Sequence, residues 1–367
     1  MQPPPSTPPQ RYAGLDAIRA GAMLLGLAYH ATYSWLPRVG PWYFVADQSP
    51  VDALVSVTGA LHSFRMQLFF ALSGFFSHLV FERRGERAYF IDRSRRLLVP
   101  LVVALPIAML LYWQLRVWSH SLGLMSSDFK PGTDFHALPL HLWFLIYLWS
   151  FCALALLAPK TTAFASLLTR ALKFPPLIFL VLSALTGLGL WLHPENRPDG
   201  AFWPQPFELF HYGLFFAFGW TLWTVRLDAA TPLRRWAWPF LLLGIGTMIF
   251  VYRGSVQWEP LGHALGGPIA WSITLGALGL ALSSSTREEN PALRFIVESS
   301  YWVYLIHYPV VLALQVVFAQ QSLPGALEYS LATLGTLLVA WVTFVVFVWR
   351  TPLGPWLGVK PPVTVKK

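Results

Sequence analysis

The sequence predicts an all-α fold, a polytopic membrane helix bundle of about ten transmembrane helices with both termini cytoplasmic. Three observations lead to this fold class. The 367 residues are 55% hydrophobic and only 12% charged, about half the charged share of a typical soluble domain. Apolar runs of about 20 residues, the length that crosses a ~30 Å hydrocarbon core, recur along the chain. Loops rich in Lys and Arg alternate with loops that are poor in them, as the positive-inside rule requires.

The predicted spans follow the apolar runs in order, and the seventh is the shortest. They cover residues 15–36, 57–81, 97–117, 139–158, 175–193, 207–226, 236–252, 261–283, 297–319 and 328–349. With the N-terminus inside, 19 Lys and Arg residues fall in the inner segments and four fall in the outer loops. One missed or added helix would place every later loop on the opposite side of the membrane and remove this excess of Lys and Arg inside. The excess therefore supports ten spans.

The segments outside the bundle are short. Residues 1–12 are Pro-rich and predicted to be a disordered tail, residues 13–352 form the bundle, and residues 353–367 form a cytoplasmic tail. No loop reaches the ~50 residues of a separate soluble domain, so any chemistry must use the bundle itself. Cys152 is the only cysteine, which excludes an intrachain disulfide. The net charge of +9 is explained by topology, so we expect no nucleic-acid partner.

The first span contains three ionisable residues, each of which costs about 2.5–3.5 kcal/mol in hydrocarbon on insertion scales. At about 100° per residue, Asp16, Arg19, Gly26 and His30 share one helix face, and Arg19 lies about 16 Å from His30 along the axis. Asp16 and Arg19 are three residues apart and can pair. A structural ion pair with a hydrogen-bonded histidine is one interpretation. A functional site is the other, and intramembrane charges favour it.

The second span repeats this pattern, because His62, Arg65 and Ser73 also share a face. Arg65 has no acidic neighbour within a turn, so it must face another helix, a water-filled cavity or an anionic ligand. We therefore take Arg65 as a candidate for substrate-donor binding, with structural pairing to a distant carboxylate as the equally weighted alternative. His62 and Ser73 are candidate channel-lining residues, although the SGFF sequence that contains Ser73 can also serve close helix packing.

The strongest basic cluster precedes the third span, in the stretch "ERRGERAYFIDRSRRLLVPL". Arg93 and Arg96 lie one turn apart there, and arginine side chains bind phosphates bidentately. The cluster has a simpler explanation as well, because cytoplasmic arginines set topology and contact anionic membrane lipids.

Four further polar residues in spans are candidate channel-lining residues. They are His141 at the start of span four, His211 in span six, and Glu298 and His307 in span nine. Taken singly, a histidine in such a position is more often a satisfied core residue or an interfacial one. No H-x-x-x-H pair is present, so no metal site is predicted. The chain also lacks G-x-S-x-G, P-loop and G-x-G-x-x-G motifs.

Four stretches together resemble the acyltransferase family 3 of integral membrane acyltransferases. They are "RYAGLDAIRAGAMLLGLAYH", "LFFALSGFF", "RSRRLLVPL" and "SSYWVYLIHYPVV". The stretches "HSFRMQLFFALSGFF", "HLWFLIYLW" and "FHYGLFFAFGW" resemble its glucan-biosynthesis branch, which implies succinyl transfer to periplasmic glucans. The sequence departs from the family pattern at Arg19-Ala20, where the family usually has Arg-Gly.

The resemblance implies acyl transfer from a cytoplasmic acyl-CoA to an extracytoplasmic sugar hydroxyl, in the bacterial inner membrane. Acyl-CoA is then a co-substrate, and no permanently bound cofactor is expected. Arg19 and His30 match the catalytic motif of the family, and Arg93 and Arg96 match its donor-side motif. We expect His30 to act as general base, since imidazole has an ordinary pKa of about 6.5. Asp16 and Arg19 would organise the inner half of the same channel.

A transporter or exporter of an anionic or sugar substrate is the alternative, because charged residues also line transport paths. The chain shows no clear internal repeat and no paired Gly/Pro-interrupted helices, features that are common in transporters. A structural scaffold gives no reason for so costly a first helix. Direct transfer and an acyl-enzyme on His30 or Ser73 both stay open at this stage.

Overall fold

The computed structural model describes most of the chain. The described residues are 12–37, 43, 45–125, 138–157, 162–194, 201–225, 231–253, 260–283, 290–357 and 359. Within these ranges every regular element is helical. Nearly all of the predicted N-terminal tail, and the C-terminal tail from residue 360 onward, lie outside them, as do several Lys and Arg residues of the loops. The cytoplasmic placement of both termini therefore stays a prediction.

A helix lies at each of the ten predicted span positions. These helices are α1 (Ala13–Ala31), α2 (Ala53–Arg84), α3 (Glu86–Ser121), α4 (Trp143–Leu157), α6 (Pro175–Leu192), α7 (Pro206–Thr224), α10 (Ala237–Arg253), α11 (Pro260–Ser283), α12 (Pro291–Phe318) and α13 (Gly325–Phe344). Shorter elements connect or extend them: η1 (Tyr33–Trp35), η2 (Leu140–Leu142), α5 (Thr162–Ala171), α9 (Thr231–Arg235), the π-helical η5 (Val345–Trp349) and α14 (Leu353–Trp356).

Seven of the described helices are long and apolar enough to cross a membrane. They are α2, α3, α4 with η2, α6, α11, α12 and α13 with η5. The 17-residue α10 is apolar but shorter, and α1 and α7 fall outside this set. The described part of the chain is thus all-helical, with seven helices long and apolar enough to cross a membrane, while the count of ten spans stays a prediction. Both α1 and α7 contain ionisable residues, which lowers their mean hydropathy.

Helix α3 contains the predicted third span, residues 97–117, and begins about three turns before it, at Glu86. Its first turns contain Arg and Glu, which interrupt an apolar run but favour helix. Gly85 separates α2 from α3 and has a φ of 77°, a left-handed conformation that glycine adopts without strain. The 36 residues of α3 span about 54 Å, so the helix extends well beyond the hydrocarbon core.

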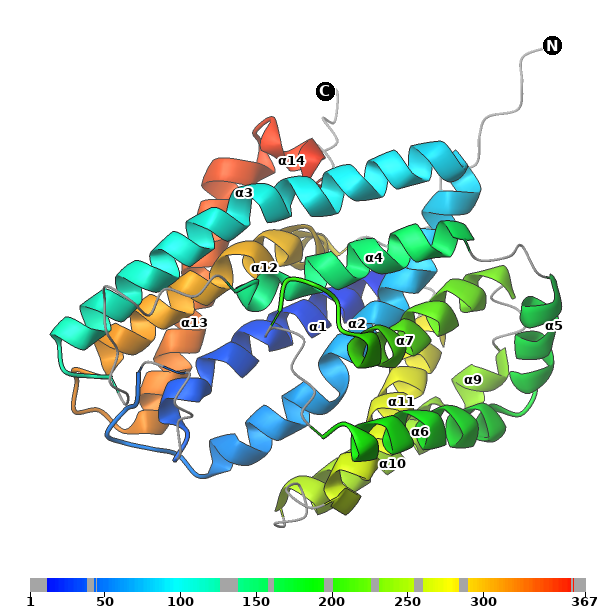
Figure 1. Ribbon diagram of the computed structural model, residues 1–367, viewed down its shortest axis with the longest axis horizontal. Helices are drawn as coiled ribbons and strands as arrows, with labels where there is room; N and C mark the ends of the chain where they lie inside the picture. The colour runs from blue at the N-terminus through cyan, green and yellow to red at the C-terminus, as the bar shows by residue number, and fades with distance from the viewer. Residues whose placement is uncertain are drawn as a thin grey trace.

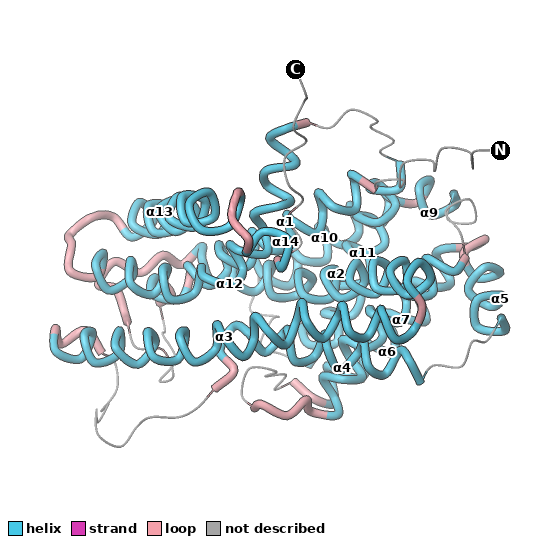
Figure 2. Tube along the Cα trace, turned by 90° about the horizontal axis from the view of Figure 1, so that it is seen from above, coloured by secondary structure: helices cyan, strands magenta, loops and turns pink. Residues whose placement is uncertain are grey.

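Helix α1 lies in the middle of the bundle, between α12 and α2 (Figure 1). It also contacts α11 and α13. Helix α12 in turn packs between α13 and α3, as Figure 2 shows. The polar residues of α1 therefore lie inside the protein, where other helices shield them from lipid.

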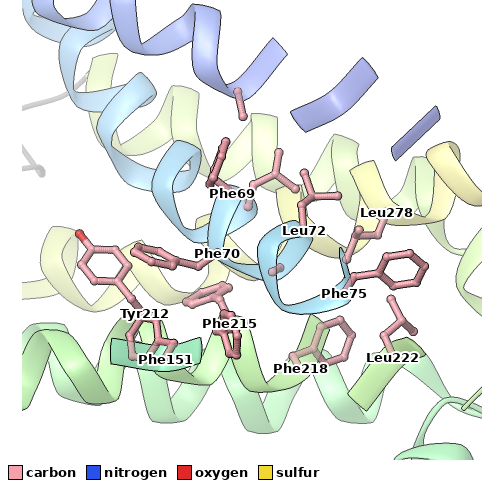
Figure 3. Close-up of a cluster of buried hydrophobic side chains, with 14 of the residues drawn as sticks. Phe69, Phe70, Leu72, Phe75, Phe151, Tyr212, Phe215, Phe218, Leu222 and Leu278 are labelled. Carbon is pink, nitrogen blue, oxygen red and sulfur yellow. The ribbon is translucent and has the colours of Figure 1, made fainter. Parts of the chain in front are cut away.

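The tightest seam of the bundle joins α2 to α7. Phe70, Phe75, Phe215 and other aromatic side chains fill this seam (Figure 3). The two backbones touch at Gly219, where an added Cβ would lie only 1.7 Å from the carbonyl oxygen of Ala71. Small residues at such crossings allow close helix packing within membranes. This seam fixes α2, and with it the polar face that α2 presents to α1.

Candidate active site

One face of α1 lines two adjacent cavities. Positions 16, 19, 23, 26 and 30, three or four residues apart, form this face. We call the larger cavity, of about 400 Å³, the basic cavity, because it is lined by Arg19, Arg83, Arg93 and Arg96. We call the smaller one, of about 30 Å³, the histidine cavity, because it is lined by His30, His141 and His307 together with Arg65.

Three side chains border both cavities: Met23 on α1, Phe69 on α2 and Phe144 on α4. We call this constriction the neck. Asp16 and His30 lie on opposite sides of it, about 21 Å apart along the axis of α1. The two ends of the predicted face of α1 therefore line two neighbouring cavities, which share these three apolar side chains as a common border.

The basic cavity has more positive than negative charge. The predicted ion pair is present, with Arg19 Nη2 at 3.0 Å from Asp16 Oδ1. Glu298 pairs with Arg294, at 2.9 Å. Arg93 Nη2 donates to the backbone carbonyl of Phe76 at 3.4 Å, and its guanidinium lies 5.9 Å from the centre of the Tyr89 ring. Its Nε has no hydrogen-bond partner among the described residues. A cavity with unsatisfied guanidinium donors is suited to an anionic ligand.

Arg96 is held in place by a carboxylate outside the cavity lining. Its Nε lies 3.2 Å from Asp92 Oδ1, and the same oxygen accepts a hydrogen bond from Arg84 at 2.7 Å. Tyr301 of α12 donates a hydrogen bond to the backbone carbonyl of Arg96 at 2.9 Å, which ties α3 to α12 at this point. Asp92 and Tyr301 were not among the candidates from the sequence, since either side chain fits a solvated helix surface equally well.

His30 lies in the last turn of α1, where four backbone carbonyls lack partners within the helix. Gln315 of α12 donates to two carbonyl oxygens there, those of His30 at 3.3 Å and Ala31 at 3.1 Å. These bonds fix the end of α1, and therefore His30, against α12. Gln315 is a polar residue inside an apolar span, and this is the feature of the sequence that could have indicated such a contact between helices.

Two histidines from distant parts of the chain line the cavity with His30, and His307 lies between the other two. The ring centroids of His30 and His307 are 5.3 Å apart, and those of His141 and His307 are 5.0 Å apart. His141 follows Leu140, whose φ of 49° is rare for a side chain with a Cβ. Tyr304 of α12 donates to the His141 carbonyl at 3.0 Å and so holds this turn in place.

Arg65 reaches the histidine cavity from α2 and is only 8% exposed. Its guanidinium lies 4.8 Å from the centre of the Tyr29 ring, and no described carboxylate forms an ion pair with it. Gly26 on α1 leaves the room that this guanidinium occupies, because a Cβ there would lie 2.4 Å from Arg65 Nη1. Arg65 is therefore next to His30 and apart from Arg93 and Arg96.

The six candidate channel-lining residues separate into three groups. Ser73 and Glu298 line the basic cavity, and His141 and His307 line the histidine cavity. His62 and His211 line neither. His62 Nδ1 lies 3.2 Å from the Tyr29 hydroxyl, and His211 Nε2 lies 3.1 Å from Gln67 Nε2, so both rings are used in contacts between helices.

The sequence profile of the acyltransferase 3 family, described as an acyltransferase domain, matches residues 12–345. The chain belongs to this family. The resemblance noted in the sequence is thereby confirmed, and the bundle is that of a membrane acyltransferase.

The similar members of this family include three proteins named glucans biosynthesis protein C. Those of Salmonella paratyphi B and Salmonella dublin are 25% identical to this chain over 345 residues, which covers 84% of each chain. That of Salmonella heidelberg is 32% identical over 152 residues, or 39% of this chain and 38% of the relative. No solved structure matches.

The acyltransferase has no group of three or more His, Cys, Asp or Glu side chains that could hold a metal ion, within the part of the chain that the structure describes. The neck residues Met23, Phe69 and Phe144 could not be found from the sequence, because apolar residues in apolar helices give no distinguishing signal.

Proposed function

We propose that this acyltransferase moves an acyl group, succinyl or acetyl, from a cytoplasmic acyl-CoA to a hydroxyl of an extracytoplasmic glucan or other polysaccharide, in the bacterial inner membrane. The observation that carries the proposal is the single face of α1 that lines both the basic cavity and the histidine cavity. Such a path lets two substrates approach one reaction centre from opposite sides. A transporter needs a path as well, but the family supports acyl transfer.

The basic cavity is the proposed donor site. Arg93 and Arg96 would bind the phosphates of coenzyme A, which need charge-assisted hydrogen bonds from guanidinium groups. The pantetheine arm is long and carries no charge, so it would pass the apolar neck at Met23 while the nucleotide stays at the basic end. The phosphate charges of the donor then never enter the hydrocarbon core. Arg19, paired with Asp16, would contact the donor between these two points.

The histidine cavity is the proposed reaction centre. His30 takes the proton from the sugar hydroxyl as its oxygen attacks the thioester carbonyl. The new C–O bond forms, the carbonyl oxygen becomes an oxyanion, and the guanidinium of Arg65 stabilises that negative charge. The C–S bond then breaks, and the leaving thiolate of coenzyme A receives the proton from His30. No covalent enzyme intermediate is needed.

The proposal is tested with purified protein, radiolabelled acyl-CoA and a glucan oligosaccharide. We expect a labelled ester in wild-type reactions and loss of at least about 100-fold in rate for His30→Gln, as for removal of a general base. His263→Gln is the matched control, because His263 lies on α11 outside both cavities. Full activity of a correctly inserted His30→Gln protein would refute the assignment of the base. Vesicle uptake without covalent product would favour the transporter instead.

The nature of the acceptor is supported by the names of the relatives, which refer to glucans. Mass spectrometry of cell-envelope glycans, with and without this protein, tests this part of the proposal. We expect a mass difference of one acyl group per modified sugar, and its value distinguishes succinyl from acetyl.

A further inference from the structure

Two imidazole nitrogens in the histidine cavity lack hydrogen-bond partners among the described residues, and so does Nε of Arg65, a donor that lines the same cavity. The two imidazole nitrogens are His141 Nδ1 and His307 Nε2. Both side chains are almost completely buried, with exposed fractions of 4% for His141 and 2% for His307. A buried polar atom without a partner is costly, so each such atom in a native protein needs an explanation.

The hydrogen-bonding role of each nitrogen follows from the opposite edge of its ring. His307 Nδ1 lies 2.8 Å from the carbonyl oxygen of Tyr304, and His141 Nε2 lies 3.2 Å from the carbonyl oxygen of Leu305. A carbonyl oxygen only accepts, so both of these nitrogens must be protonated donors. In a neutral imidazole the remaining nitrogen is an acceptor. The cavity therefore contains two acceptors, His141 Nδ1 and His307 Nε2.

The ligand that satisfies these atoms must donate hydrogen bonds. A metal cation also binds imidazole lone pairs, but the guanidinium of Arg65 lines the same cavity and repels cations. A neutral hydroxyl group is free of this repulsion. The volume of about 30 Å³ holds the hydroxyl-bearing edge of a sugar and excludes a whole ring.

We propose that His141 Nδ1 and His307 Nε2 form the acceptor subsite, where they accept hydrogen bonds from hydroxyl groups of the polysaccharide and orient the reacting oxygen toward His30. This inference rests on the proposed function and deepens it. His141 and His307 are then binding residues for the sugar, while His30 alone moves the proton. The backbone bonds of both rings fix the acceptor lone pairs before the sugar arrives.

Asparagine and glutamine variants separate the two edges of each ring. The amide nitrogen of Asn can replace a Nδ1 donor, and the amide oxygen of Gln can replace a Nε2 acceptor. His307→Gln therefore keeps the acceptor, whereas His307→Asn keeps only the bond to the backbone. At position 141 the edges are reversed, so His141→Asn keeps the acceptor and His141→Gln keeps only the backbone bond.

The test measures KM for a glucan oligosaccharide at saturating acyl-CoA in all four variants. We expect His307→Asn to have a KM at least about fivefold above that of His307→Gln, and His141→Gln a KM at least about fivefold above that of His141→Asn. The KM for acyl-CoA should stay within about twofold of wild type, since the donor contacts the basic cavity. Thermal unfolding in detergent checks that each variant is folded.

The opposite order at both positions would overturn the inference, because it would show that only the bonds to backbone carbonyls matter. Equal losses in all four variants, or no change in any, would overturn it too, since neither follows from a lost acceptor. These results are distinct from failure of the proposed function, in which the wild-type protein itself forms no labelled ester.

Discussion

The position of the Arg65 guanidinium can be altered by a substitution at another residue. Gly26→Ala on α1 adds one methyl group at the point where the guanidinium lies, with its carbon 2.4 Å from Arg65 Nη1. An ordinary van der Waals contact begins at 3.4 Å. The guanidinium must therefore move by about 1 Å, away from the place where we expect the oxyanion to form.

The size of the effect follows from this displacement. A misplacement of about 1 Å in an active site can lower a rate about 100-fold, so we expect a loss of that order in kcat for Gly26→Ala. Stability should not fall in parallel, because Arg65 Nη1 is the end of a flexible side chain and alanine favours helix over glycine by about 0.5–1 kcal/mol. The substitution thus separates activity from folding.

Gly21→Ala is the matched control, because it lies on the same helix and a Cβ there would meet no atom within 4 Å. Initial rates of acyl transfer and thermal unfolding temperatures are measured for both variants. We expect Gly21→Ala to keep wild-type activity while Gly26→Ala loses it at a similar unfolding temperature. Equal, undiminished activity in the two proteins would refute the role of Arg65 at the reaction centre.

Three other variants test the neck, the donor site and the α2–α7 seam. Met23→Trp should close the neck and abolish acyl transfer, while coenzyme A still binds in calorimetry. Leu25→Trp, at a 36% exposed position of the same helix, is the control and should retain both acyl transfer and coenzyme A binding. Acyl transfer by Met23→Trp would contradict the passage of the donor through the neck. Arg96→Ala should raise the KM for acyl-CoA about tenfold or more, since a charged hydrogen bond contributes about 1.5–3 kcal/mol. An unchanged KM would show that Arg96 does not bind the donor. Gly219→Ala should lower the unfolding temperature, because overpacking costs about 1–3 kcal/mol. Gly246→Ala should leave it unchanged, because a Cβ at Gly246 would meet no atom within 4 Å. Equal unfolding temperatures for the two variants would contradict the close approach of α2 and α7.

The sequence predicted the helices well where apolar runs are long, as in α11 and α13, because hydrocarbon thickness sets their length. It failed where helix continues through charged residues, as in the first turns of α3, since hydropathy does not detect helix outside lipid. The short α5 and α9 were likewise missed in predicted loops. Their lengths of 10 and 5 residues are too small for an apolar run to mark them.

The candidate site was predictable along α1 and not across the bundle. Helical periodicity alone placed Asp16, Arg19 and His30 on one face, and in the structure that face lines two adjacent cavities. The meeting of His30 with His141 and His307 depends on how α1, η2 and α12 pack, which no local pattern encodes. The functional roles of these residues stay predictions until the variants above are measured.

The path along α1 from the basic cavity to His30 is the central claim, and a cryo-electron-microscopy structure with a non-hydrolysable acyl-CoA analogue tests it most directly. We predict the phosphates at Arg93 and Arg96, the pantetheine arm through the neck at Met23, and the acyl carbonyl beside Arg65 and His30. An analogue bound elsewhere, or one whose acyl group stays on the Arg93 side of the neck, would contradict the account.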